Sequence, residues 1–327
     1  MNDQELLNLK GYYINFPKLA QKLKEIAVEQ KMTQSELAAG ITPREHLNKI
    51  LNGHRNPSLI VLYQMCDKLH VDINLLIEQC YYIDYEQTTH YIHEMKKCVT
   101  IGDYDQLEQL VEECTQFEDF HHGIAKQFST YQKGIIQLKK YNHPVIALNY
   151  FEEALNASAI LLEGQETLAH SLVTEEVSIQ IDKAICLFQL SQEKEAIQLL
   201  SSLINHKVAN DYRSIETYHI LRAYFYLSKF YLLTKDYEMA LVAATEGINL
   251  AHCKFIYIYA GDLHSIKGLA LHHLENKRES VSNFNLAFKF YSLFEAQHQK
   301  ELLNEHLIEL GIIKRQEKSK TINKPEK

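Results

Sequence analysis

The sequence predicts an all-α protein in two parts: a small five-helix domain with a helix-turn-helix, then a right-handed superhelical array of helical hairpins. Two helix-start signals lie close together within residues 33–57, TQSELAAGITPREHLNKILNGHRNP. Five later segments repeat one hairpin pattern. The chain of 327 residues has only eleven Gly and five Pro with 46% apolar residues, which is typical of an ordered, strongly helical protein.

The helix-turn-helix is predicted from its two helix starts. Thr33 and Glu36 fit a capping box, in which each side chain binds a backbone N–H of the first turn. The sequence TPRE repeats the pattern, with Pro43 at the first helical position, where a missing N–H costs nothing. The two helices must then meet through a tight turn at Gly40. Such a unit presents its second helix to the DNA major groove.

Amphipathic helices flank this unit on both sides. A helix over about residues 17–31 has one apolar stripe, and Pro57 opens a further amphipathic stretch. Asp72 caps a last helix over residues 73–77. Five short helices can enclose a small core. The apolar stripes are Leu19, Leu23, Ile26 and Ala27 upstream, and Leu59, Leu62, Cys66 and Leu69 downstream.

Motif, caps and flanking helices together resemble the Cro/C1-type (XRE) DNA-binding domain over residues 18–80. The matching motifs are T-Q-x-E-L-A, then I-x-x-G-x-x-x-P, then a helical L-x-x-L-x-x-x-x-x-x-L stretch. The chain departs from the pattern at Leu51, where many members carry Glu. We expect packing to replace an internal polar contact there.

The second helix of the motif has two faces. At 100° per residue, Leu47, Ile50 and Leu51 share the side that packs inward. The opposite side is polar and can read base edges, since Arg and Lys bind guanine and Glu accepts from cytosine. The resemblance implies that Gln34 and Arg55 meet phosphates. A solvated polar face is the alternative. The predicted DNA-binding residues are Gln34, Arg44, Glu45, Asn48, Lys49, Asn52 and Arg55.

The net charge of −8 is unevenly distributed. Residues 1–77 hold nine Lys and Arg against eight Asp and Glu, which leaves 25 against 34 for the remainder. The predicted DNA-binding domain therefore has a net charge of +1. DNA affinity depends on the local field, so one weakly basic copy should bind weakly.

Composition and motif searches point away from membranes, metals and catalysis. No apolar run approaches the ~18 residues of a membrane span, and no signal peptide precedes the first helix. The six cysteines lack C-x-x-C pairing, which favours reduced thiols in a cytoplasmic protein. The 17 histidines show no H-E-x-x-H or Cys/His spacing. No P-loop, G-x-G-x-x-G or G-x-S-x-G is present. We therefore predict no enzyme activity, no catalytic residue, no cofactor and no metal.

From about residue 95 to residue 313 the chain reads as helix after helix with short polar breaks. The equivalent small or apolar positions recur at intervals of 40, 49, 44 and 40 residues, which suits stacked helical hairpins. The segment KDYEMALVAATEGI resembles a tetratricopeptide (TPR) repeat. In such an array the first helices line a concave groove that suits an extended peptide. The equivalent positions are Leu107, Ala147, Ala196, Ala240 and Ser280.

An XRE-like domain followed by TPR-like repeats resembles the RNPP family of peptide-sensing regulators. The resemblance implies a homodimer formed through the repeats, a palindromic operator in double-stranded DNA, and a short linear signalling peptide in the groove. The predicted peptide-binding residues are Ser178, Asp182, Arg222, Tyr226, Lys229 and Lys267. Solvated helix faces are the alternative for these six. Tyrosines such as Tyr224, Tyr231, Tyr257 and Tyr259 are expected to pack within hairpins.

The predicted organisation has five parts. They are an N-terminal segment at 1–17, the DNA-binding domain at 18–80, a linker or linker helix at 81–94, the repeat domain at 95–313 and a basic tail at 314–327.

The alternative function is that of an inhibitory TPR scaffold. Such a chain would bind a protein partner, as the related Rap proteins do, and would leave its helix-turn-helix unused.

Overall fold

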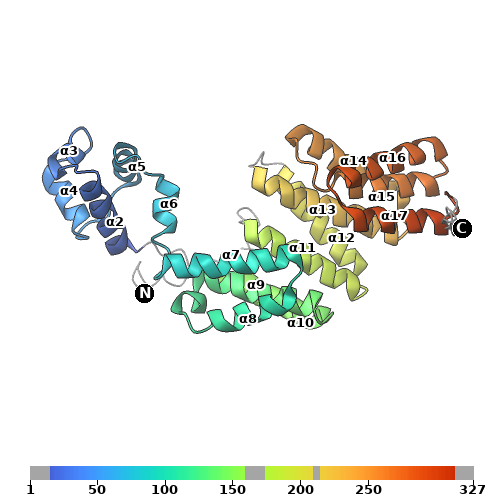
Figure 1. Ribbon diagram of the computed structural model, residues 1–327, viewed down its shortest axis with the longest axis horizontal. Helices are drawn as coiled ribbons and strands as arrows, with labels where there is room; N and C mark the ends of the chain where they lie inside the picture. Colours follow the sequence, from blue (N-terminus) through green and yellow to red (C-terminus); the bar gives the residue numbers. More distant parts are fainter. Residues whose placement is uncertain (1–14, 159–173, 209–213, 314–327) are drawn as a thin grey trace, which may run out of the picture. The chain divides into compact units, whose positions relative to one another are not determined.

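The computed structural model describes residues 15–158, 174–208 and 214–313, and every regular element in these ranges is helical (Figure 1). The predicted all-α class is confirmed. The predicted tail lies outside the described residues, as does the N-terminal segment before residue 15. The chain divides into two compact units, residues 1–168 and 169–327. Within the described ranges, no helix is long and apolar enough to cross a membrane.

The first unit begins with five short helices that enclose one core, here called the head domain. Buried side chains from all five helices form this core, so the two predicted apolar stripes are confirmed except at Leu59, which is 72% exposed. Leu59 is the first residue of its helix, where the side chain points away from the core. The head-domain helices are α2 (Phe16–Glu29), α3 (Gln34–Ala38), α4 (Arg44–Leu51), α5 (Leu59–Lys68) and α6 (Ile73–Glu78).

The first predicted helix start is confirmed and the second is wrong in detail. Thr33 and Glu36 form the complete capping box of α3. At the start of α4, Pro43 has ψ 141°, so it stands outside the helix and no side chain caps the first turn. The Thr42 hydroxyl instead bonds the Nδ1 atom of His46 at 2.8 Å. Pro43 itself holds the N-cap position of α4, so Thr42 lies one residue before the position from which it could cap the first turn.

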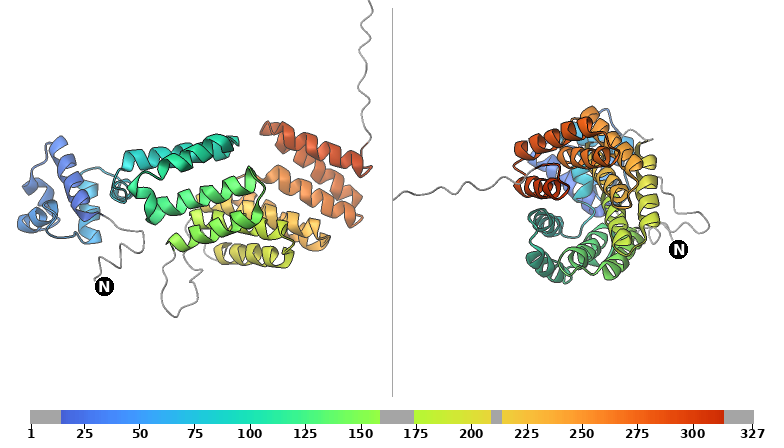
Figure 2. Two further views of the ribbon diagram at one scale, coloured as in Figure 1. Left: turned by 90° about the horizontal axis from the view of Figure 1, so that it is seen from below. Right: turned by 90° about the vertical axis from the view of Figure 1, so that its right-hand side faces the viewer.

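Longer helices complete the first unit and build the second. Successive helices pair as antiparallel hairpins, and Figure 2 shows them lying side by side within each unit. In the first unit these are α7 (Tyr85–Ile101), α8 (Tyr104–Cys114), the 3₁₀ helix η1 (Glu118–His121), α9 (Gly123–Lys139) and α10 (Pro144–Ser158). In the second unit they are α11 (Thr174–Gln189), α12 (Glu193–Val208), α13 (Ser214–Leu233), α14 (Tyr237–Lys254), α15 (Ala260–His273), α16 (Lys277–Leu293) and α17 (Gln297–Glu309).

The predicted register of the hairpins is confirmed. Each of the five equivalent positions is the fourth residue of a second helix, in α8, α10, α12, α14 and α16. All five side chains are at most 1% exposed. Small residues suit this position because the paired helices approach closely there. In the last hairpin, the Ser280 hydroxyl even donates to the Gly268 carbonyl of α15 at 2.8 Å.

Candidate functional site

Helix α4 presents the two faces that its spacing predicts. Leu47, Ile50 and Leu51 are at most 3% exposed and belong to the buried core of the head domain. Leu51, where related domains often carry Glu, therefore contributes apolar packing. The Asn52 side chain donates to the Asn48 side chain at 2.9 Å along the outer face. Of the predicted DNA-binding residues, Arg44, Glu45, Asn48, Lys49, Asn52 and Arg55 are exposed and Gln34 is half-buried.

The turn between α3 and α4 is held by a lysine from another helix. Gly40 has φ +77°, a conformation that favours glycine. The Lys68 ammonium of α5 donates to the carbonyls of Glu36 at 2.5 Å and Ala39 at 2.8 Å. These carbonyls lie at the C-terminal end of α3, where a cation also suits the helix dipole. Hydrogen bonds from Thr33 lower the pKa of Glu36, which keeps the capping carboxylate ionised.

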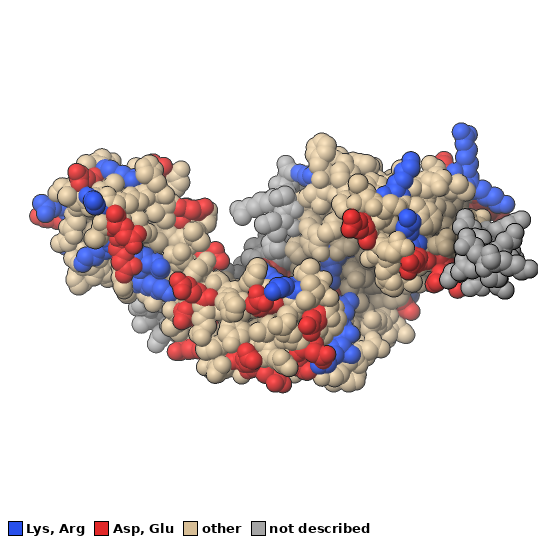
Figure 3. All heavy atoms as spheres, in the orientation of Figure 1, with Lys and Arg blue, Asp and Glu red and all other residues tan. Residues whose placement is uncertain are grey.

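Charges of both signs are interspersed over the face of the molecule in Figure 3, including the part that carries α2–α6. This pattern agrees with a head domain of net charge near zero. On the face shown, no broad positive patch lies over α2–α6.

A second group of side chains lies on α13 in the second unit. Tyr218, Arg222, Phe225 and Lys229 are spaced by four, three and four residues, which places them on one side of the helix. We call these four residues the α13 stripe. None of the four is fully buried. The first helix α13 contacts α11 and also α15, the first helices of the hairpins before and after it, so the stripe has a neighbouring helix on each side.

Toward α11 the contacts are polar. Arg222 pairs with Asp182 at 2.5 Å, and the Asp182 side chain is 1% exposed. One helical turn away, the Ser178 hydroxyl bonds the Nδ1 atom of His219 at 3.0 Å. The Arg222 guanidinium also lies 5.7 Å from the ring of Tyr226. The structure thus brings four of the predicted groove residues together: Ser178, Asp182, Arg222 and Tyr226.

Toward α15 the contacts are aromatic. The Tyr259 ring stacks on Phe225 with centroids 5.6 Å apart, and its hydroxyl lies 3.3 Å from that of Tyr218. Burial is the main cause that raises the pKa of Tyr259 far above its ordinary value, so the phenol stays neutral. Tyr259 precedes α15 and packs against Phe225 and Tyr218 of the preceding hairpin.

The other two predicted cations have different surroundings. Lys229 is exposed, with its ammonium 5.8 Å from the Phe225 ring. Lys267 is half-buried on α15. Asp262, which the sequence reasoning missed, bonds the Tyr291 hydroxyl at 3.0 Å. Burial raises the pKa of Asp262, while the charge of Lys229 opposes that rise. The sequence analysis also missed Tyr218 and Phe225, although their helical spacing from Arg222 and Lys229 is a signal that could have found them. No comparable signal marks Asp262.

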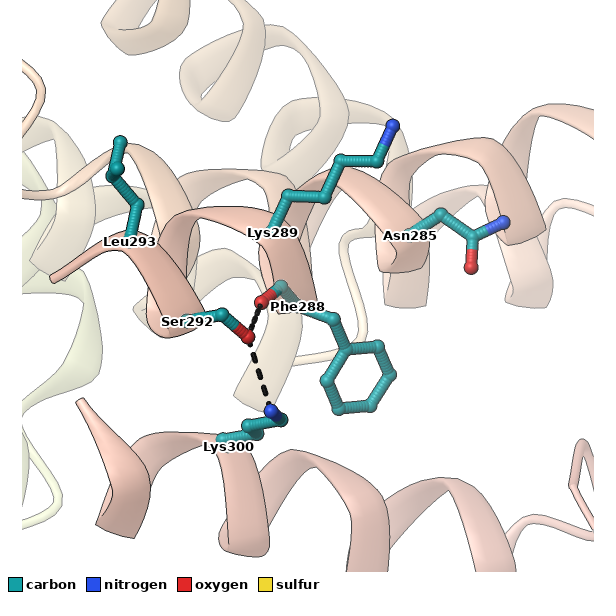
Figure 4. A pocket seen from close by; sticks show the side chains of 6 residues that line it. All are labelled: Asn285, Phe288, Lys289, Ser292, Leu293 and Lys300. Atoms are coloured by element: carbon teal, nitrogen blue, oxygen red, sulfur yellow. Dashed lines mark hydrogen bonds between the residues drawn. The ribbon is translucent and has the colours of Figure 1, made fainter. Parts of the chain in front are cut away.

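A pocket of 680 Å³ lies between α16 and α17 (Figure 4). The Lys300 ammonium donates to the Ser292 hydroxyl at 3.0 Å, and that hydroxyl donates to the Phe288 carbonyl. In Figure 4 Lys289 points away from Lys300, so the two cations do not converge on one point. Five of the six cysteines are buried, and Cys253 is exposed. The described part of the chain contains no group of three His, Cys, Asp or Glu side chains suited to a metal ion.

Residues 23–76 match the helix-turn-helix family model, which covers the head domain from α2 to α6. Together with the geometry of α3 and α4, this shows that the chain carries a helix-turn-helix domain. No curated protein matches the sequence.

Solved structures extend the similarity to nearly the whole chain. Bacillus thuringiensis PlcR, in complex with the peptide PapR7 and DNA, is 20% identical with a TM-score of 0.73 over 88% of this chain and 99% of that one. ComR from S. thermophilus, in complex with DNA and its signalling peptide ComS, is 14% identical with a TM-score of 0.57, covering 90% and 99%. The Streptococcus dysgalactiae SHP pheromone receptor Rgg2 is 10% identical with a TM-score of 0.58, covering 89% and 99%.

At these identities the likeness establishes a shared fold. The resemblance predicted from the sequence is therefore confirmed at the level of architecture: a helix-turn-helix domain followed by a helical repeat domain like that of PlcR and ComR.

Proposed function

We propose that this chain is a cytoplasmic, peptide-sensing transcriptional regulator. It binds a palindromic site in double-stranded DNA as a homodimer through its repeat domain, and a short linear signalling peptide sets that DNA binding, as in quorum sensing. The single observation that carries the DNA part is the exposed polar face of α4 above a fully buried apolar face, within a segment that matches the helix-turn-helix family model.

The residues proposed to contact DNA divide by chemistry. Arg44 and Lys49 stand on the exposed face of α4 and suit the acceptors of guanine. Arg55 follows α4, and Gln34 begins α3, so both suit phosphate contacts. Glu45, Asn48 and Asn52 complete the polar face. Because the domain is nearly neutral, two copies on one DNA are needed for strong binding, which supports a homodimer on two half-sites.

The peptide part rests on the face formed by α11, α13 and α15. Tyr218, Phe225 and Tyr259 form a half-exposed aromatic platform that suits an apolar peptide side chain. Lys229 stands exposed at one end of the α13 stripe and suits a peptide carboxylate. Ser178, Asp182, Arg222, Tyr226 and Lys267 surround this face. The peptide-bound structures of PlcR and ComR, which share this fold, support a ligand of the same class.

An inhibitory scaffold like the Rap proteins is the competing function, and it requires no DNA contact. A gel-shift at low and at moderate salt with random-sequence duplexes distinguishes the two. A regulator retains a selected subset of sequences when the salt concentration rises, whereas a scaffold retains none. Capture of small peptides on the purified chain, identified by mass spectrometry, tests the ligand. Loss of captured peptide in a Lys229→Ala variant supports the proposed face.

A further inference from the structure

Residues 81–84 lie between α6 of the head domain and α7, directly before α7, and we call them the connector. Ile83 is 58% exposed. Apolar packing therefore does not hold Ile83 in place. Hydrogen bonds with two charged side chains hold it instead, one side chain on each side of the connector.

The head-domain side contributes Lys18 of α2. Its ammonium donates to the Tyr82 carbonyl at 2.7 Å and to the Ile83 carbonyl at 3.0 Å. Just before the connector, the Cys80 carbonyl accepts from the Asn15 N–H at 3.0 Å. The N-terminal end of α2 is thus hydrogen-bonded to the backbone that follows α6, between Cys80 and Ile83.

The other side contributes Asp119 of η1, which is 7% exposed. Its carboxylate accepts the N–H of Ile83 at 2.7 Å and the N–H of Asp84 at 2.9 Å. It also accepts the Thr88 hydroxyl of α7 at 2.8 Å. A buried carboxylate needs such donors, and hydrogen bonds to an ionised acceptor are stronger than those between neutral groups.

The two sides meet at one residue. Lys18 holds the carbonyl of Ile83, and Asp119 holds its N–H. A change of the connector's φ or ψ angles would break bonds to both partners at once. The connector therefore acts as a fixed joint between the head domain and the helices that follow.

We propose that Lys18 and Asp119 are positioning residues that fix the half-site spacing at which a dimer of this chain can bind DNA. The inference rests on the proposed function. Two recognition helices held by a dimer must enter the major groove one helical turn or a multiple apart, ~34 Å per turn, and on the same side of the duplex. A fixed joint restricts binding to one spacing, whereas a loosened joint lets each head reach neighbouring spacings.

The experiment uses the full-length chain and needs no known operator. Duplexes with a random-sequence insert several helical turns long are selected for binding, and the retained sequences are read for half-site sequence and spacing. Wild type should retain one spacing, and moving the half-sites by one base pair should weaken binding at least ~10-fold. In Lys18→Met and in Asp119→Asn this loss should shrink to about twofold, with the half-site sequence unchanged.

Two matched variants control for charge. Lys24→Met removes an exposed lysine from the same helix, and Glu118→Gln removes an exposed carboxylate beside Asp119, so both should keep the wild-type spacing. Faster amide exchange at Ile83 and Asp84 in Asp119→Asn verifies that the bonds are lost. Lys18→Met leaves the buried Asp119 carboxylate intact. If Asp119→Asn folds poorly, the half-site spacing can therefore still be measured with Lys18→Met.

The outcomes separate the inference from the function on which it rests. If wild type selects paired half-sites at one spacing and both variants keep that preference, the positioning role is overturned and the proposed function stands. An altered half-site sequence in Lys18→Met also overturns it, because the residue would then act on base reading. If wild type selects isolated half-sites, both proposals fall.

Discussion

The carboxylate of Asp182 on α11 lies 2.5 Å from the guanidinium of Arg222 on α13, and Asp182 is almost completely buried. The pair joins the first helices of two successive hairpins. Removal of one partner from a buried pair costs ~3–5 kcal/mol, because the remaining charge loses a close counterion. Arg222 therefore stabilises the repeat domain in addition to any contact with a ligand, and its variants test both roles at once.

On this face, Lys229 is the informative residue for ligand recognition. Lys229→Ala should weaken binding of the captured peptide at least several-fold, since a hydrogen bond to a charged group is worth ~1.5–3 kcal/mol. It should leave the melting temperature and the DNA affinity without peptide nearly unchanged, because the side chain is exposed. Arg222→Ala should weaken peptide binding and also lower the melting temperature. Calorimetry measures the peptide affinity of each variant. If the affinity is unchanged in both, the peptide binds to another surface.

Base reading should depend on Arg44 and Lys49, whereas Arg55 should act on all sequences. Arg44→Ala is expected to cost ~1–3 kcal/mol on the selected site and to relax preference at one base position. Arg55→Ala should weaken all duplexes similarly and flatten the salt dependence. Gel-shifts over a salt series measure both effects. Normal binding of the selected site by Arg44→Ala would show that α4 is not the reading helix.

Lys68 should support DNA binding without touching DNA. Lys68→Met removes the donor to the Glu36 and Ala39 carbonyls, which should cost about 1 kcal/mol of stability. Because the turn before α4 loosens, affinity for the selected DNA should fall as well. Thermal unfolding followed by circular dichroism measures the first effect, and gel-shifts measure the second. Lys24→Met serves as the control for charge, and an identical fall in affinity there would assign the effect to electrostatics alone.

The close approach of α15 and α16 should be sensitive to a single methyl group. A Cβ at Gly268 would lie 2.5 Å from the Phe284 ring, which is 3% exposed and has little room to move. Gly268→Ala should therefore destabilise the fold by ~1–3 kcal/mol, although alanine favours helix elsewhere. Asn285→Ala, at an exposed position of α16, should have little effect. A higher melting temperature for Gly268→Ala would contradict this packing.

His264 should make stability depend on pH. Burial lowers its pKa below the ordinary 6.5, and the nearby charges of Lys267 and His252 act in the same direction. The unfolded chain then holds this proton more tightly than the folded chain. The neutral His264 ring therefore adds to stability above about pH 6.5. This contribution is lost as the pH falls from 6.5 toward the lower pKa that His264 has in the folded chain.

Asn is a suitable replacement because its amide can stand in for the Nδ1 atom, 2.9 Å from Asn283, without titrating. The melting temperature of His264→Asn should therefore fall less than that of wild type between about pH 7.5 and about pH 5.5. Some dependence should remain, because burial also lowers the pKa of His273. Equal slopes in both proteins would show that His264 does not carry the effect.

Local sequence patterns were enough to predict the helices, the buried face of α4 and the register of the hairpins. Leu47, Ile50 and Leu51 share a buried face because helical periodicity is a local property. Ala240 and Ser280 occupy one structural position because the hairpin pattern recurs along the chain and buries the fourth residue of each second helix. Thr33 caps its helix through atoms three residues away. All of these features depend on neighbours within a few turns of the chain.

Local patterns could not predict which side chains meet across hairpins, because these contacts form only when the helices stack. Asp182 and Arg222 are 40 residues apart, and Asp119 reaches the N–H of Ile83 from 36 residues away. The aromatic platform on α13 likewise includes Tyr259 of the next hairpin. These contacts depend on how far one helix is shifted and rotated against another, which the packing of the whole core sets. Periodicity places a residue on a face, and stacking alone selects its partner.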